Sequence, residues 1–232
     1  SAVYTVPYRE LSAVVHSCAE WLSRSDDQEM VTTWVVAHHR VVDAAWERWR
    51  TVLPMTFGTV IKGEPGTEAE RNTEAWLKQE YEVLKGRMEV VRGKAEYGVQ
   101  VFWDPKVVAQ DLAQVVPEIQ KLDQEIKTKP RGLAYMYRQR LEGLLRKEME
   151  AKAEQSFRDF YSRIRRHAAD VVAEKTKQSE KGGQMILNLS CLVDRERYLE
   201  LGEELDRINQ QKGFWVRYTG PWPPYSFVGS AW

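Results

Sequence analysis

The chain has 232 residues and a mass of 27.0 kDa, which suits one large domain or two small ones. Its 34 basic residues balance 34 acidic ones, so the composition gives no support for a general electrostatic attraction to nucleic acid or to an anionic membrane. No apolar run approaches the roughly 18 residues of a membrane span, and no charged start precedes an apolar segment, so we expect neither a membrane protein nor a secreted one.

Two residue types refine this picture. The two cysteines, Cys18 and Cys191, have no CxxC partner or nearby histidine at ligand spacing, so we expect buried, reduced thiols in a cytosolic protein. Nine tryptophans and ten tyrosines are an unusually large number, and aromatic side chains are favoured at protein interfaces as well as in cores.

The first hundred residues predict strands alternating with helices. Residues 3–15 are rich in β-formers and predict one strand with a break near Pro7. The elements that follow are a helix over 28–50, a strand over 53–61, a helix over 68–91 and a strand over 97–103. This order predicts an α+β domain, residues 1–104, in which the strands share one sheet.

Beyond Asp104-Pro105 the pattern changes to long polar helices, which predicts a second, helix-rich α+β domain over residues 105–219. Its expected elements are a helix over 107–126 broken or bent at Pro117, a long helix over 133–175, a loop over 175–183, a strand over 185–193, a helix over 196–210 and a strand over 214–219.

Residues 220–232 form a third segment, a tail rich in proline and aromatic residues. Proline fixes φ and lacks the N–H that a ladder needs, so this stretch cannot continue a helix or lie in a central strand. A stiff aromatic segment loses little entropy on docking, and we expect it to bind a partner or to fasten domains together. The residues assigned to this role are Gly220, Pro221, Trp222, Pro223, Pro224, Tyr225 and Phe227.

Other candidate sites have simpler explanations. His38 and His39 point about 100° apart on a helix, so they do not converge on one metal ion, and we expect His38 near the core and His39 in solvent. The basic residues around Arg163 lie among acidic ones, which is typical of a mixed-charge surface as well as of a nucleic-acid site. No nucleophile elbow or phosphate-binding loop occurs, and we predict no catalytic residue, cofactor or metal.

Several segments together resemble the gas vesicle protein L/F family (GvpL/GvpF). The segment 52–60, V-L-P-M-T-F-G-T-V, is similar to a family strand, and its motif residues Leu53, Pro54, Phe57 and Gly58 are assigned a structural role. Residues 97–101 match the strand after the second helix, and 217–227, R-Y-T-G-P-W-P-P-Y-S-F, match the closing signature. Residues 131–136 are similar to a "GPAYL"-type helix start but depart from its wording. The likeness covers essentially the whole chain in order.

The resemblance implies an N-terminal ferredoxin-like α/β sandwich, a modified ferredoxin-like C-terminal domain and an extended tail. Family members begin with a short strand that is absent here, so we expect the first sheet to lack an element. The resemblance also implies a non-enzymatic cytoplasmic protein of gas vesicles, and hence of buoyancy. Its implied partners are the hydrophobic shell protein (GvpA-like) and other accessory proteins. It does not choose between a chaperone and a built-in component, or between an F-type and an L-type member. The alternative is a ferredoxin-like small-molecule-binding regulator or enzyme.

Overall fold

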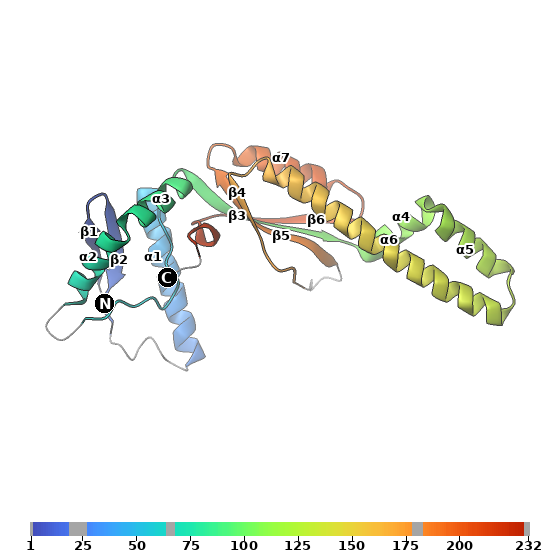
Figure 1. Cartoon of the computed structure of the whole chain (residues 1–232), viewed down its shortest axis with the longest axis horizontal. Helices are drawn as coiled ribbons and strands as arrows, with labels where there is room; N and C mark the ends of the chain where they lie inside the picture. Colours follow the sequence, from blue (N-terminus) through green and yellow to red (C-terminus); the bar gives the residue numbers. More distant parts are fainter. Residues whose placement is uncertain (1, 19–26, 64–67, 178–182, 230–232) are drawn as a thin grey trace. The chain divides into compact units, whose positions relative to one another are not determined.

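The computed structural model describes residues 2–18, 27–63, 68–177 and 183–229 (Figure 1). These residues pack into two compact units. The first contains residues 1–96 and 221–232, and the second contains residues 97–220. The domain ranges expected from composition stay a prediction. By packing, residues 97–103 lie in the second unit, and the tail from Pro221 onward lies in the first.

The first unit begins with a β-hairpin. Strands β1 (Val3–Tyr8) and β2 (Leu11–His16) pair antiparallel, with Val6 opposite Ala13 and Tyr8 opposite Leu11. The turn between them needs a left-handed residue, and Arg9 supplies it with φ 51°. The prediction of one strand broken near Pro7 was therefore wrong. Pro7 lies inside β1, and the chain reverses at the two residues after Tyr8.

Helix α1 (Gln28–Trp49) confirms the first predicted helix. Asp27 is its N-cap, and the Asp27 carboxylate accepts hydrogen bonds from the backbone N–H groups of Glu29 and Met30 at 3.0 and 3.2 Å. The helix ends at Arg50, which takes the left-handed conformation at φ 61°.

The second predicted helix is two helices, α2 (Ala69–Gln79) and α3 (Tyr81–Val91), which meet at Glu80. Leu77, Tyr81 and Leu84 form the buried core of this region with Leu11 of β2. Burial of these side chains removes apolar surface from water and holds the hairpin against the helices.

The second unit is built on a four-stranded sheet with the order β4-β5-β3-β6. Its strands are β3 (Lys94–Trp103), β4 (Asp170–Ala173), β5 (Gln184–Asp194) and β6 (Phe214–Trp222). The expectation that the three strands of the first hundred residues share one sheet was wrong, because β3 pairs with β5 and β6, whereas β1 pairs with β2. The fold is α+β.

Strand β5 is central, and residues 185–193 are all buried, as their apolar run predicts. Polar side chains within the sheet are paired across strands. Gln100 donates to Asn188 Oδ1 at 3.2 Å, and Trp103 Nε1 donates to Gln184 Oε1 at 3.0 Å.

Four helices complete this unit as far as it is described, and in Figure 1 the second half of α6 and helix α7 lie along the sheet. They are α4 (Pro105–Val115), α5 (Pro117–Thr128), α6 (Arg131–Arg165) and α7 (Tyr198–Asn209). Pro117 separates α4 from α5, as predicted. The long helix was predicted to reach residue 175, but it ends at Arg165. Residues 170–173 instead form β4, because their backbone groups pair with β5.

Candidate functional site

The carboxy-terminal tail starts as part of the sheet. Gly220, Pro221 and Trp222 are the last residues of β6, which lies at the edge of the four-stranded sheet. An edge strand tolerates proline because its outward side needs no ladder hydrogen bond. Gly220 takes φ 120°, a conformation that favours glycine. The exposed side chain of Trp222 is therefore held on a short, stiff piece of strand.

The next part of the tail turns inward and packs on the first unit. Pro223 and Pro224 are buried, and residues 225–227 form the short 3₁₀-helix η2. The backbone N–H of Tyr225 donates to the carbonyl of Pro223 at 2.8 Å, and that of Phe227 to Pro224 at 3.2 Å. The prolines fix the entry into this turn, and the side chain of Phe227 is half-buried.

A buried carboxylate anchors the turn. Glu96 of β3 is buried, and both of its oxygens accept hydrogen bonds from Ser226, one from the backbone N–H and one from the hydroxyl, each at 2.7 Å. A buried carboxylate without donors is costly, and hydrogen bonds to an ionised acceptor are among the strongest in proteins. This contact joins residues 130 positions apart in the sequence.

Two further contacts flank the anchor. Tyr225 Oη lies 2.8 Å from His39 Nδ1, and the two rings are 5.3 Å apart. Burial, and then the negative charges of Asp43 and Glu96, raise the pKa of Tyr225 to about 12, so its hydroxyl stays protonated at neutral pH. Arg87 Nη1 donates to the carbonyl of Val228 at 2.9 Å, which holds the last part of the turn against α3.

The second predicted motif, the segment 53–58, contacts His38, the residue next to His39 on α1. His38 Nε2 is 3.1 Å from the carbonyl oxygen of Met55, and the His38 ring meets Phe57 edge-on at 5.8 Å. Burial lowers the pKa of His38, and the Met55 hydrogen bond only partly offsets this. The predicted strand over 53–61 is wrong, because residues 51–63 form a loop with a turn at Phe57-Gly58.

The motif residues have different environments within that loop. Leu53 packs against the Leu77–Tyr81 core, Pro54 is buried, and Gly58 takes φ 86°. Phe57 is exposed on one side and contacts His38 on the other. The loop is thus held in place by an apolar anchor at its start and by His38 at its turn.

The consecutive histidines therefore bring the two predicted motif segments to one helix. The loop over 53–58 contacts His38, and the tail contacts His39. Sequence reasoning placed His38 near the core, and it is half-buried. His39 is exposed, as expected, but its Nδ1 also forms a hydrogen bond with the hydroxyl of Tyr225. Glu96 and Arg87 were missed. A glutamate between Ala95 and Tyr97 in an apolar strand was the available signal for Glu96.

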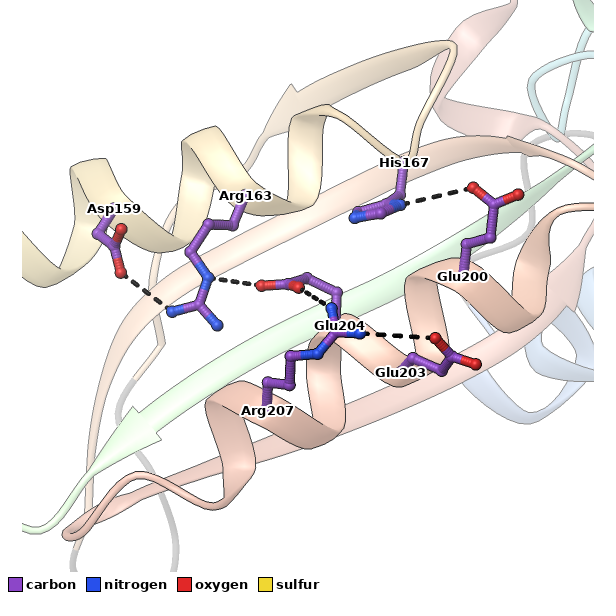
Figure 2. Close-up of polar contacts among 7 residues, drawn as sticks. All are labelled: Asp159, Arg163, His167, Glu200, Glu203, Glu204 and Arg207. Carbon is purple, nitrogen blue, oxygen red and sulfur yellow. Dashed lines mark hydrogen bonds and ion pairs between the residues drawn. The ribbon is translucent and has the colours of Figure 1, made fainter.

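A separate polar cluster joins α6 to α7 in the second unit (Figure 2). Arg163 Nε donates to the buried Glu204 carboxylate at 2.5 Å, and Arg207 Nη1 donates to the same group at 2.6 Å. Asp159 accepts from Arg163 at 3.1 Å. Burial opposes ionisation of Glu204, but the bonds from the two arginines outweigh it and hold its pKa below the usual value.

This cluster accounts for part of the basic patch noted in the sequence. A cavity of about 380 Å³ beside it is lined by Asp159, Ser162, Arg163, Arg166, His167 and Glu204. Arg163 is committed to two carboxylates, and Arg158 pairs with Glu154 at 2.5 Å. The Arg163–Glu204 pair fastens α6 to α7, and the pairs with Asp159 and Glu154 lie within α6, which are structural roles.

The described residues also bear on metals, thiols and membranes. Within them, no group of three or more His, Cys, Asp or Glu side chains is placed to hold a metal ion. None of the helices in the described ranges combines the length and the apolar character that crossing a membrane requires. Both cysteines are free thiols; Cys191 is buried as expected, whereas Cys18 is exposed.

Comparison with known proteins connects these features to a family. Residues 1–229 match the family model described as gas vesicle synthesis protein GvpL/GvpF. The chain is 30% identical to gas vesicle protein L1 of Halobacterium salinarum over 97% of its length and 80% of that protein. It is 27% identical to gas vesicle protein L of Haloferax mediterranei over 98% of its length and 71% of that protein.

The structure agrees with this match. It is similar to the crystal structure of the gas vesicle protein GvpF from Anabaena sp. PCC7120, with a TM-score of 0.73 and 19% identity, over 99% of this chain and 88% of the other. The family match includes the 53–58 loop, the tail as far as Gly229 and the helix that both contact. The chain belongs to the GvpL/GvpF family of gas vesicle synthesis proteins.

Proposed function

We propose that this protein acts without catalysis in gas vesicle formation, as an assembly accessory or minor structural protein that binds the hydrophobic shell protein. The observation that carries the proposal is the family match over residues 1–229. A shell subunit that faces gas is very apolar on that side and exposes an adhesive patch before assembly. A partner with many aromatic residues and a net charge near zero is suited to cover such a patch.

Within this proposal, the tail divides into two functional parts. Residues 223–228 are the clasp, since Pro223, Pro224 and Val228 are buried and Ser226 is bonded to Glu96. Trp222 is the partner contact, because its side chain is 51% exposed on a strand that fixes its position. A pre-organised tryptophan gains contact area on binding with little loss of side-chain freedom.

The two parts are tested with two sets of variants. Purified shell protein is immobilised, and retention of the full chain is compared for the wild type, Trp222→Ser and Trp49→Ser. Trp49 is the matched control, since it is a tryptophan with nearly the same exposure, 49%, at the end of α1. We expect Trp222→Ser to weaken retention about tenfold or more, as is usual for a central aromatic contact. Its melting temperature and that of Trp49→Ser should be unchanged.

The outcomes separate the parts of the proposal. If the wild type is not retained, shell binding is wrong. If the wild type is retained and Trp222→Ser binds as well as Trp49→Ser, the proposal of shell binding is supported but the proposed role of Trp222 is wrong. Ser226→Ala is the counterpart for the clasp, and it should lower the melting temperature while leaving retention of the folded protein intact.

The choice between chaperone and component has its own test. A component remains with intact vesicles after flotation and washing in high salt, whereas a chaperone is found in the unassembled fraction. An immunoblot of both fractions distinguishes them. The ferredoxin-like description of each half and the association with other accessory proteins are part of the proposal.

A further inference from the structure

The outer edge of strand β6 is blocked along its first half only. β6 lies at the edge of the four-stranded sheet, and its second half, residues 217–222, is exposed. In the first half, the backbone N–H of Phe214 donates to the carbonyl of Gln211 at 3.1 Å, and that of Val216 donates to Asn209 Oδ1 at 3.0 Å. Bonds of this kind use up the groups through which an edge strand pairs with another chain.

The second half of the edge keeps such groups available. The backbone groups of successive residues in a strand point to opposite sides, so groups two residues apart point to the same side. The N–H of Val216 points outward to Asn209, and the N–H groups of Tyr218 and Gly220 therefore point outward as well. No loop or side chain of the described residues is bonded to these two groups. We call residues 218–220 the open edge.

Helix α7 runs beside this edge and leaves space there. Gly202 and Tyr198 lie seven and eleven residues before Asn209, which places all three on one face of α7. The chain reverses between α7 and β6, and seven residues of helix span about 10 Å, the length of about three residues of strand. Because Asn209 reaches Val216, Gly202 lies level with the open edge. Apart from the neighbouring backbone of α7, no atom of the described residues lies within 4 Å of the position that a Cβ would take at Gly202.

Two tyrosines border this space. Phe214 meets Phe160 of α6 edge-on at 5.3 Å, so the even-numbered side chains of β6 face the helices. The ring of Tyr218 is held there by stacking on Tyr97, with ring centres 5.3 Å apart. Burial, and then neighbouring groups that include Tyr198, raise the pKa of Tyr218, so the two tyrosines lie near each other. Tyr218 and Tyr198 are nevertheless 37% and 43% exposed.

From these observations we propose that the open edge binds an extended segment of a partner protein, which adds to the sheet as a further strand. The backbone of the segment pairs with the outward groups of Tyr218 and Gly220. A large apolar side chain of the segment fills the space at Gly202 and covers Tyr198 and Tyr218. In strand addition of this kind the main-chain bonds supply affinity, and the pockets for alternate side chains supply specificity.

The other face of the segment is acidic. Arg217 lies on the opposite face of β6 from Tyr218, it is exposed, and no carboxylate of the described residues pairs with it. A carboxylate directly across from an arginine on a neighbouring strand stabilises the pairing. The segment therefore alternates apolar and acidic residues. The inference goes beyond binding of the shell protein and does not depend on it or on Trp222.

Other occupants fit the open edge less well. Neither a nucleic acid nor a lipid carries donors and acceptors that alternate at the spacing of a strand. A second copy of this chain could offer its own open edge, but the exposed half of β6, R-Y-T-G-P-W, contains no acidic residue. Two copies would bring together two arginines and no carboxylate from these strands.

The test uses the full chain and a defined probe. The probe is a fluorescein-labelled peptide of roughly ten residues, about 33 Å when extended, in which glutamate alternates with valine and one central valine is replaced by tyrosine. Binding is measured by fluorescence anisotropy. Gly202→Leu fills the proposed space, and Gly143→Leu is its matched control, because Gly143 lies inside α6 with equally open surroundings. Arg217→Glu reverses the proposed charge, and Arg131→Glu makes the same change at an exposed residue elsewhere in the second unit.

We expect Gly202→Leu and Arg217→Glu to weaken binding about tenfold or more, and the two controls to change it less than about twofold. A peptide with lysine in place of glutamate should bind poorly to the wild type and better to Arg217→Glu. Circular dichroism should show that the leucine variants fold, because leucine is a better helix former than glycine.

The backbone bonds are tested in the peptide itself. One version is N-methylated at every apolar residue and another at every glutamate. Because a strand presents the N–H groups of alternate residues to each neighbour, only one of the two versions should lose binding. Sedimentation of the free chain tests the rival occupant, and it should show a monomer.

Four results would overturn the inference. The first is absence of peptide binding to the wild type. The second is an equal loss in Gly202→Leu and Gly143→Leu, or in the two arginine variants. The third is loss of binding in both N-methylated peptides or in neither, which would exclude pairing as a strand. The fourth is a dimer that Gly202→Leu dissociates, which would assign the open edge to a second copy of the chain.

Discussion

The ion pairs between α6 and α7 give a prediction whose magnitude follows from the structure. Replacing Glu204 with glutamine removes the negative charge and turns one of the two oxygens that accept from Arg163 and Arg207 into an NH2 donor. Removing one member of a fully buried ion pair costs about 3–5 kcal/mol, because the other charge is left unpaired in the interior. Here the arginine side chains are 22% and 59% exposed, and Arg163 keeps Asp159, so part of the loss is recovered. We expect Glu204→Gln to lower the free energy of unfolding by about 1–3 kcal/mol.

The pH dependence gives a second, independent readout of the same change. Because the folded protein holds the pKa of Glu204 below its ordinary value of about 4.5, the carboxylate contributes stability above that pH. This contribution is lost as the pH falls through the folded pKa. The glutamine variant has no such group, so the difference in stability between wild type and variant should be full near pH 7 and should narrow below about pH 4.5.

Thermal unfolding followed by circular dichroism measures both effects, and a loss of this size corresponds to several degrees, about 2–4 °C per kcal/mol. Hydrogen exchange of peptides from α6 and α7 locates the loss in the second unit. The control is Glu203→Gln, since Glu203 is exposed and lies 3.6 Å from Arg207. A loss below about 0.5 kcal/mol for Glu204→Gln, an equal loss for Glu203→Gln, or a difference that does not change with pH would refute the reasoning.

Three further predictions concern the tail, the sheet and the motif loop. Ser226→Ala should lower stability by about 1–2 kcal/mol in a urea titration, because a buried carboxylate loses one of its two donors; no change would show that water replaces the hydroxyl. Gly98→Ala should destabilise by about 1–3 kcal/mol, since its Cβ would lie 2.6 Å from Thr219 Oγ1, and Thr219→Ala in the same chain should restore most of the loss. Gly58→Ala should cost about 1 kcal/mol through its φ of 86° alone, whereas Gly86→Ala inside α3 should be neutral or stabilising; melts that rank them the other way would contradict this.

Much of the local structure could be predicted because its causes are local. Asp27 caps α1, Pro117 separates two helices, and the apolar run over 185–193 forms a buried strand. These features depend on backbone chemistry and side-chain period, which are visible in a short window of sequence.

The errors came from long-range packing. The helical pattern before residue 170 continues beyond it, but pairing with β5 converts residues 170–173 into a strand. The segment 53–61 has the residues of a strand, yet Gly58 turns it and Leu53 anchors it on a helical core. The strands that pair with β3 lie about a hundred positions away in the sequence, and the periodicity of side chains within one strand does not indicate its pairing partners.

In the candidate site, too, the local features could be predicted from the sequence and the long-range contacts could not. The aromatic and proline content of the tail predicted a stiff docked segment, and in the structure Pro223 and Pro224 are buried and Ser226 is bonded to Glu96. Its principal anchor, Glu96, could not be assigned from the sequence, because the donor and acceptor are 130 residues apart. The separation between the exposed Trp222 and the buried Pro223 and Pro224 needed coordinates as well.

The position of the tail also affects the order of events during synthesis. The first unit consists of residues 1–96 together with residues 221–232, so its two parts are synthesised before and after the whole second unit. Domains usually fold as units from the N-terminus while the chain is still growing. Here Glu96 and Arg87 are synthesised before their hydrogen-bond partners Ser226 and Val228, because the whole second unit lies between them in the sequence. The first unit can therefore be completed only after Ser226 and Val228 have been synthesised, so truncation before Ser226 would remove contacts of the first unit rather than of the second.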